Sequence, residues 1–253
     1  MNLREALAVE RGVACVVGAG GKKSTMYALA RQIDRAVVTA TVRIPVFDQH
    51  VAEVVLTDDP AGALEAATDW PLGLVPGVDE GRDDRYLGYD PAVIDRIAES
   101  PVPDAVLVKA DGARMREFKT PGDREPQVPA SADTVLPIVS VQAVGRPLDS
   151  DVVHRPERVA AITGLEQGDR IEPDHVAAVV AHERGGRKDV PADATVVPVV
   201  NKVDDEEWLE VAREVAAGIH RRTDVPRVAL TRMTASDPLV ECVGLTPGDG
   251  APR

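Results

Sequence analysis

The sequence predicts a single three-layer α/β domain built on a mainly parallel sheet. Short apolar segments alternate with segments of helical periodicity, an order that leads to right-handed crossovers and parallel strands. Hydrophobic residues make up 44% of the 253 residues, but aromatic residues only 3%. A core of Val, Ala, Leu and Ile suits parallel strands that helices cover on both faces. The length suffices for one large domain over residues 1–253.

The first elements surround a glycine turn. A short helix over 2–9 leads into a buried apolar strand over 13–17. After the turn, a helix is expected because its apolar residues lie three, four and seven positions apart, at Met26, Leu29, Ala30 and Ile33. The β-branched segment 36–41 predicts the second strand.

The next elements are shorter. Segment 54–57 predicts a third strand, and a helix over 60–67 follows, with Asp58 or Asp59 as its N-cap and Pro60 in its first position. Segment 72–75 is short and apolar. We expect the acidic segment 79–84 to be a surface loop, and Asp90-Pro91 to open another helix.

The second half repeats the alternation. Apolar runs predict strands at 105–109, 134–144, 195–200 and 227–230, and helical periodicity predicts helices at 154–162, 173–182 and 205–221. Residues 113–129 are charged, contain prolines and lack periodicity, so we expect a long functional loop near 112–130. A poorly ordered tail is expected near 245–253.

Charge and composition exclude several classes of partner. The chain has 42 acidic and 29 basic residues, a net charge of −13. Such a surface repels nucleic acid and anionic membranes, so we expect neither as a partner. Most basic residues are Arg, and the few lysines include Lys22, Lys23, Lys109 and Lys202, near the candidate site. This composition suits a halophilic source; an ordinary acidic cytosolic protein is the alternative.

Localisation and redox chemistry are constrained as well. No apolar run approaches the ~18 residues of a membrane span, and the first residues, MNLREALAVERG, lack the layout of a signal peptide. We therefore expect a cytoplasmic protein. Cys15 and Cys242 are too few for a disulfide framework or a zinc site.

The segment VVGAGGKKST predicts a phosphate-binding turn between a strand and a helix. Glycines allow backbone N–H groups to approach phosphate oxygens, and the helix start adds its positive end. The spacing is closer to the compact loop Gly-x-x-Gly-Lys-Ser/Thr than to the longer Walker pattern. Lys23 then stands where a hydroxyl would hold Mg²⁺, unless Ser24 or Thr25 supplies it. The expected binding residues are Gly18, Ala19, Gly20, Gly21, Lys22, Lys23, Ser24 and Thr25.

Asp111 follows the 105–109 strand, as the Mg²⁺-holding aspartate does in P-loop NTPases. The alternative is a turn or N-cap aspartate. In the following loop, Arg114, Arg116, Lys119 and Arg124 suggest anion recognition. Alternatively, these cations pair with Glu117, Asp123 and Glu125 in a solvated loop.

A second nucleotide motif, Asn201-Lys202-Val203-Asp204, follows the 195–200 strand. Asn201 and Asp204 could hydrogen-bond a base, and a carboxylate that accepts from guanine N1 and N2 would discriminate against adenine. The alternative is that Asp204 or Asp205 caps the following helix. Because all these motifs follow strands of a parallel sheet, they are expected to share its carboxyl edge.

Two further groups have weaker signals. Thr39, Thr41 and Arg43 close the second strand and could sense a γ-phosphate or a substrate, although β-branched residues are also ordinary strand residues. His154 and its neighbours Arg155, Pro156 and Glu157 open a helix, where capping and salt bridging are the alternative to a ligand role.

Six ordered segments carry a family resemblance: Gly18 to Lys22, Thr39 to Ile44, Ala110 to Arg114, Glu125 to Pro129, Val153 to Glu157 and Asn201 to Asp204. The series resembles the YqeC family, accessory proteins of selenium-dependent molybdenum hydroxylases, over roughly Leu7 to Asp204. The resemblance implies a P-loop NTPase-like fold. It also implies a role in making or inserting the selenium cofactor, together with a maturation or hydroxylase partner protein.

The chain departs from the family pattern at four positions. Lys23 replaces the expected hydroxyl residue, and Arg43 stands where the family usually has His. Lys109 and Arg124 stand where Glu and His are expected. Each change adds positive charge or removes a titratable group. The departures put Mg²⁺ binding and turnover in question.

Two functions follow from these observations. In the first, Lys22 and the loop amides bind GTP or ATP, Ser24 or Thr25 with Asp111 holds Mg²⁺, and Arg114 or Arg116 donates charge during hydrolysis or phosphoryl transfer. In the second, nucleotide gates binding or delivery without significant hydrolysis, which Lys23 favours. A dinucleotide-dependent oxidoreductase is disfavoured because the third glycine of that motif is missing.

Overall fold

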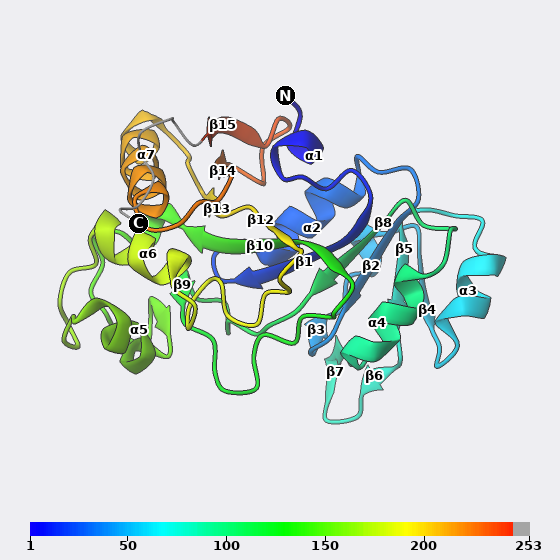
Figure 1. Cartoon of the computed structure of the whole chain (residues 1–253). Helices are drawn as coiled ribbons and strands as arrows, with labels where there is room; N and C mark the ends of the chain where they lie inside the picture. Colours follow the sequence, from blue (N-terminus) through cyan, green and yellow to red (C-terminus); the bar gives the residue numbers. More distant parts are fainter. Residues whose placement is uncertain (245–253) are drawn as a thin grey trace.

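The computed structural model describes residues 1–244, and the tail predicted near 245–253 lies outside them. Within residues 1–244 the central element is a ten-stranded sheet in which β14–β15 is the antiparallel pair (Figure 1). Its order is β15 (Leu239–Gly244), β14 (Arg227–Thr231), β13 (Val199–Asn201), β10 (Ala132–Ser140), β1 (Gly12–Gly18), β8 (Ala105–Lys109), β2 (Ala36–Ala40), β5 (Leu72–Val75) and β4 (Glu53–Leu56), with β12 (Thr195–Val196) beside β10.

Helices cover both faces of this sheet, which confirms the predicted three-layer α/β fold. Alternate residues of β1 enter different cores: Ala14 and Val16 pack with Met26 and Leu29 of α2 (Lys22–Ala30). Val13, Cys15 and Val17 belong to the core that also holds Ile94 and Ile97 of α4 (Pro91–Ala98). A period of two along the strand therefore sorts its side chains between two helical layers.

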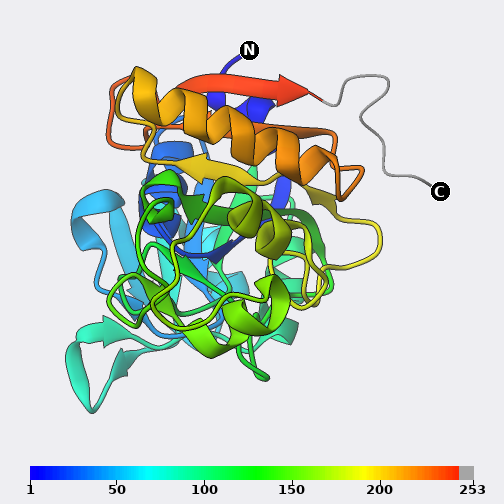
Figure 2. The ribbon, with the colours of Figure 1, turned by 90° about the vertical axis from the view of Figure 1, so that its left-hand side faces the viewer.

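The remaining helices complete the layers. They are α1 (Leu3–Ala6), α3 (Pro60–Ala66), α5 (Pro156–Thr163), α6 (Pro173–Ala181) and α7 (Glu206–His220). Helices α6 and α7 pack on each other and build a separate core with β13 and β14; Figure 2 shows α7 lying along that end of the sheet. Among the described residues, no helix has the length and apolar content needed to cross a bilayer.

The parallel strands place the predicted motifs along one edge of the sheet. The neighbouring strands β13, β10, β1, β8 and β2 end at Asn201, Ser140, Gly18, Lys109 and Ala40. The segments that follow them carry the glycine turn, Asp111 and the Asn201–Asp204 motif. The prediction that the motifs share the carboxyl edge is therefore confirmed.

Several predicted boundaries were wrong. The 134–144 strand ends at Ser140 and continues as a 3-10 turn over Val141–Ala143. The 195–200 strand is divided into β12 and β13 around Pro198, a residue without an N–H group for the ladder. The first helix ends early, and Ala8 has a φ of 53°.

Two small sheets and one strand had no counterpart in the predictions. Part of the expected surface loop 79–84 is a hairpin, in which β6 (Val78–Asp79) and β7 (Arg82–Tyr86) pair, and β3 (Ile44–Pro45) adds to β7. Strand β9 (Phe118–Lys119) pairs with β11 (Val153–His154). The edge strand β15 was missed as well.

Candidate anion-binding site

The glycine turn between β1 and α2 has a geometry that only glycine fits. Gly18, Gly20 and Gly21 have φ values of 89°, 79° and 144°. A Cβ on Gly21 would lie 2.1 Å from Nδ2 of Asn201, and one on Gly18 would lie 2.2 Å from the carbonyl oxygen of Ile138. The turn therefore lies closely against β10 and β13.

Hydrogen bonds hold the turn and leave a set of amides free. The N–H groups of Gly18, Ala19 and Gly20 donate to Asp111, Ile138 and Arg116, at 2.8, 2.8 and 3.1 Å. Among the described residues, the amides of Lys22, Lys23 and Ser24 in the first turn of α2 have no acceptor. These amides, at the positive end of a helix, are suited to an anion.

Asp111 is the centre of a buried charge cluster. It is 1% exposed, and its carboxylate lies 2.9 Å from Lys22 Nζ and 2.8 Å from Lys119 Nζ. Lys22 contacts Oδ1 of Asp111, and this oxygen has no hydrogen-bond partner, so the contact is an ion pair without hydrogen-bond geometry. Burial opposes ionisation, but the ammonium groups of Lys22 and Lys119 outweigh it and hold the pKa of Asp111 below its usual range.

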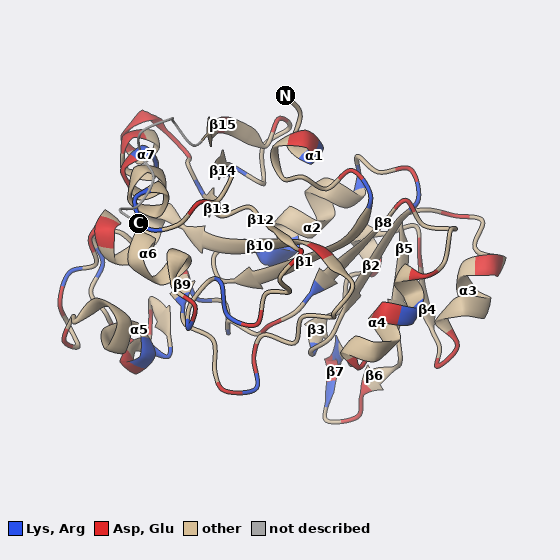
Figure 3. Ribbon diagram, viewed as in Figure 1, with Lys and Arg blue, Asp and Glu red and all other residues tan. Residues whose placement is uncertain are grey.

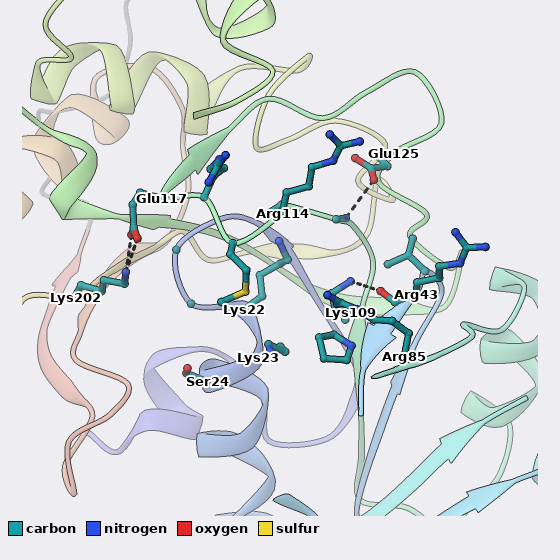
Figure 4. A pocket seen from close by; sticks show the side chains of 18 of the residues that line it. Lys22, Lys23, Ser24, Arg43, Arg85, Lys109, Arg114, Glu117, Glu125 and Lys202 are labelled. Atoms are coloured by element: carbon teal, nitrogen blue, oxygen red, sulfur yellow. Dashed lines mark hydrogen bonds and ion pairs between the residues drawn. The ribbon is translucent and has the colours of Figure 1, made fainter. Parts of the chain in front are cut away.

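A cavity of about 640 Å³ opens above the turn (Figure 4). Nine basic side chains line it but only two acidic ones, Glu117 and Glu125. The basic residues are Lys22, Lys23, Arg43, Arg82, Arg85, Lys109, Arg114, Arg116 and Lys202. Two of these basic residues, Lys22 and Lys23, form the start of α2, which is blue in Figure 3, whereas red acidic residues are common on the outer helices and loops.

Both lining carboxylates are already paired. Glu117 lies 2.7 Å from Lys202 Nζ. Glu125 lies 3.1 Å from Lys119 Nζ and 2.8 Å from the Arg155 guanidinium. They therefore do not neutralise the other cations of the basic cavity.

Three lining cations have no carboxylate partner. Within residues 1–244, no carboxylate oxygen lies within 4.0 Å of Lys23, Lys109 or Arg114. Lys109 is 6% exposed, and its ammonium donates to the carbonyl of Arg43 at 2.9 Å. Burial, with a contribution from Lys22, lowers the pKa of Lys109 to about 7. Burial and the nearby Arg85 lower the pKa of Lys23.

The predicted functional loop is fixed at one end and exposed at the other. Lys119, 1% exposed, contacts Asp111 and Glu125, so the pairing alternative holds for this lysine. Arg114 and Met115, at the exposed part, have positive φ values of 47° and 63°. Arg114 and Arg116 line the basic cavity, whereas Arg124 does not.

The Asn201–Asp204 motif is divided between two environments. Asn201 is buried, its amide donates to the carbonyl of Gly20 at 2.9 Å, and its oxygen accepts from Thr231 and Met233 at 3.1 Å each. Asp204 is exposed and accepts from Gln142 at 2.7 Å. Asp205, not Asp204, caps α7. Lys202 lines the cavity, and base recognition by Asn201 and Asp204 stays a prediction.

The other candidate side chains are used within the fold. The hydroxyls of Thr39 and Thr41 donate to the carbonyls of Leu74 and Gln127, both at 2.7 Å. His154 is partly buried, and burial together with Arg155 lowers its pKa to about 4. It is therefore neutral at physiological pH.

The residues predicted to hold Mg²⁺ offer few free oxygen ligands. Asp111 contacts two ammonium groups and an amide, and Thr25, fully buried, donates its hydroxyl to Gly21. Ser24 alone of the three lines the cavity. Within the described residues no three His, Cys, Asp or Glu side chains form a metal-binding group. Magnesium binding stays a prediction, and this donor set does not fit it.

Arg82 and Arg85 are cavity residues that sequence reasoning missed. Both come from β7, which antiparallel pairing with β3 positions beside the end of β2. The acidic segment 79–84 was interpreted as a surface loop, and residues 82–86 are charged without the apolar alternation that would have predicted a strand.

These features define an α/β protein with a cavity lined by basic side chains at the carboxyl edge of a mainly parallel sheet. A family model described as YqeC protein matches residues 14–157. The chain is also 30% identical over 194 residues to "Uncharacterized protein YqeC" of Escherichia coli (strain K12), which covers 75% of each chain. The chain therefore belongs to the YqeC family.

Proposed function

We propose that this chain is a nucleotide-binding accessory protein that holds the phosphates of GTP or ATP in the basic cavity. The observation that carries the proposal is the convergence of nine Lys and Arg side chains around the free amides of the first turn of α2. In a chain with a net charge of −13, such a concentration is suited to a strongly anionic ligand.

The charge is distributed for an oligophosphate. Lys23 and Ser24 lie at the glycine turn, Arg114 and Arg116 on the loop after β8, and Arg85 and Lys109 on the opposite side (Figure 4). A triphosphate offers three phosphate groups to these separate sets of basic side chains, whereas a single phosphate offers one. Lys202 and the exposed Asp204 lie next to the turn on the β13 side, where a base could extend.

Two activities are compatible with this ligand. Catalytic hydrolysis or phosphoryl transfer would use Lys22, Asp111, Arg114 and Arg116. Nucleotide-gated binding is favoured by one observation, the mutual pairing of Lys22 and Asp111, which leaves neither group free for a reacting phosphate. The exposed loop residues Arg114 and Met115, in an unfavourable backbone region, are then the part that nucleotide reorders.

The cellular role that we propose follows from the family resemblance. It is maturation of the selenium cofactor of molybdenum hydroxylases in the cytoplasm, through docking to a maturation or hydroxylase partner protein. The conformation of the loop that carries Arg114 and Met115 would then depend on whether nucleotide is bound, and this conformation would control the docking.

The test is calorimetric titration with GTP, ATP and CTP, with and without Mg²⁺. Arg114→Gln should weaken binding on the order of tenfold, because a charge-assisted contact contributes roughly 1.5 kcal/mol. Arg124→Gln is the matched control, since it removes the same charge from the same loop outside the cavity. Equal losses in both variants, or no binding by the unmodified protein, would contradict the proposal.

A further inference from the structure

Lysine and arginine side chains line the basic cavity, whereas a metal-dependent phosphate site needs oxygen ligands for the metal. Mg²⁺ is held in nucleotide sites by one or two carboxylates, hydroxyls and phosphate oxygens. Here Asp111 is neutralised by Lys22 and Lys119, and Glu117 and Glu125 are paired with Lys202 and with Lys119 and Arg155. Among the residues that the structure describes, both lining carboxylates and the adjacent Asp111 are therefore already paired with cationic side chains.

Two ammonium groups are available instead. Lys109 is buried and uses one of its three N–H donors on the carbonyl of Arg43, which leaves two for a ligand. Lys23 has no hydrogen-bond or carboxylate partner among the described residues, so its three donors are free. The two side chains come from the start of α2 and the end of β8, and both line the cavity (Figure 4).

From this arrangement we propose that the cavity binds an oligophosphate as the free anion, with Lys23 and Lys109 supplying the positive charge that a divalent cation supplies elsewhere. The proposal deepens the proposed function and rests on it, because it specifies the charge state of the ligand. A magnesium complex carries two fewer negative charges than the free anion and adds a dication to a cavity that already has an excess of cations. Repulsion between like charges then weakens binding of the complex.

The first experiment titrates the protein with inorganic tripolyphosphate and with ATP and GTP, in EDTA and in saturating Mg²⁺. We expect every ligand that binds the protein to bind at least as tightly in EDTA as in Mg²⁺. If the magnesium complex of the ligand loses one charge-assisted contact with the protein, binding in EDTA should be on the order of tenfold tighter. Binding that is more than threefold weaker in EDTA would overturn the inference and leave the proposed function intact.

The other outcomes separate the two proposals. Metal-free binding of tripolyphosphate without binding of ATP or GTP would support the inference and contradict the nucleotide function. Absence of binding by all three ligands would overturn both.

Variants identify the groups responsible. Lys23→Gln, at a half-buried position in the first helical turn, and Lys109→Met, which replaces a buried ammonium with an apolar chain, should weaken binding in EDTA by roughly tenfold. The loss should be smaller in Mg²⁺, because the bound metal already neutralises part of the phosphate charge. Arg221→Gln is the control, since Arg221 ends α7 and lines no part of the cavity. Equal losses with and without Mg²⁺ would show that these lysines do not replace a metal.

Discussion

The buried cluster at Asp111 leads to a quantitative prediction for Asp111→Asn. Asparagine keeps the shape of aspartate and an oxygen that can accept from the Gly18 amide, so the change removes mainly the charge. Lys22 and Lys119 would then be two buried ammonium groups, 6% and 1% exposed, with Glu125 as the remaining nearby carboxylate. An uncompensated buried charge is among the most destabilising single changes in proteins.

Removing one partner of a buried ion pair costs about 3–5 kcal/mol. For a chain of this size, a loss of ~3 kcal/mol lowers the melting temperature by roughly 10 °C. With an m-value of ~3 kcal/mol per molar urea, the same loss moves the unfolding midpoint by about 1 M. Urea unfolding followed by circular dichroism therefore measures the effect directly.

The control is Asp174→Asn, which removes a carboxylate that also contacts two basic groups, Arg221 and Arg222. Asp174 is 59% exposed, so water can replace its contacts, and the urea unfolding midpoint of the Asp174→Asn variant should barely differ from that of the unmodified protein. The double variant Asp111→Asn/Lys119→Met should recover part of the stability, because it removes one of the unpaired ammonium groups. A shift below about 0.3 M urea for Asp111→Asn would refute the reasoning, since it would mean that the cluster contributes as little as an exposed pair.

Three further predictions concern the turn, the base and the thiols. Gly21→Ala should lower stability by about 1–3 kcal/mol and reduce triphosphate affinity, because the backbone φ of 144° is unfavourable for alanine and the added Cβ would clash with Asn201. Gly77→Ala is the control, because a Cβ at Gly77 meets no other atom. Equal unfolding midpoints for the two variants would contradict this geometry. Asp204→Ala should erase any preference for GTP over ATP in competition binding, and a retained preference would remove guanine recognition by this residue. Burial raises the pKa of the Cys15 thiol, so at pH 8 Cys15 should react with a chromogenic disulfide only after the protein unfolds. The half-buried Cys242 should react first. Rapid reaction of both thiols in the folded protein would show that β1 opens.

The layered fold could be predicted from the sequence because its signals are local. Strand β8 matches the predicted strand 105–109 at both ends, and the segment 72–75, noted as short and apolar, forms strand β5. Asp59 and Asp90 cap α3 and α4, as their positions before a proline indicated. Local periodicity and capping suffice where an element is defined by its own residues.

The missed parts depend on contacts between distant segments. Strand β7 is exposed along most of its length and rich in charge, so its own residues give no strand signal; it is defined by pairing with β6 and with β3, about forty residues earlier in the chain. The pairing of Lys119 with Asp111 could not be predicted from the sequence either, because nothing in the sequence around a loop lysine indicates that its side chain will be only 1% exposed. Consequently the glycine turn, Asp111 and Arg114 were candidates from local sequence signals, whereas the cavity residues Arg82 and Arg85 were missed.

The distribution of lysine connects these findings. The chain contains six lysines, and Lys22, Lys23, Lys109 and Lys202 line the basic cavity. The other two hold its loop: Lys119 binds Asp111 and Glu125, and Lys188 donates to the carbonyls of Gly122, Asp123 and Glu125. Arginine supplies every other positive side chain. An ammonium group is a compact point charge with three rotatable donors, whereas the planar guanidinium fork binds carboxylates and phosphates in a fixed bidentate geometry. In an acidic chain that otherwise uses arginine, all six lysines therefore line the basic cavity or hold its loop, although they are spread from position 22 to position 202 of the sequence.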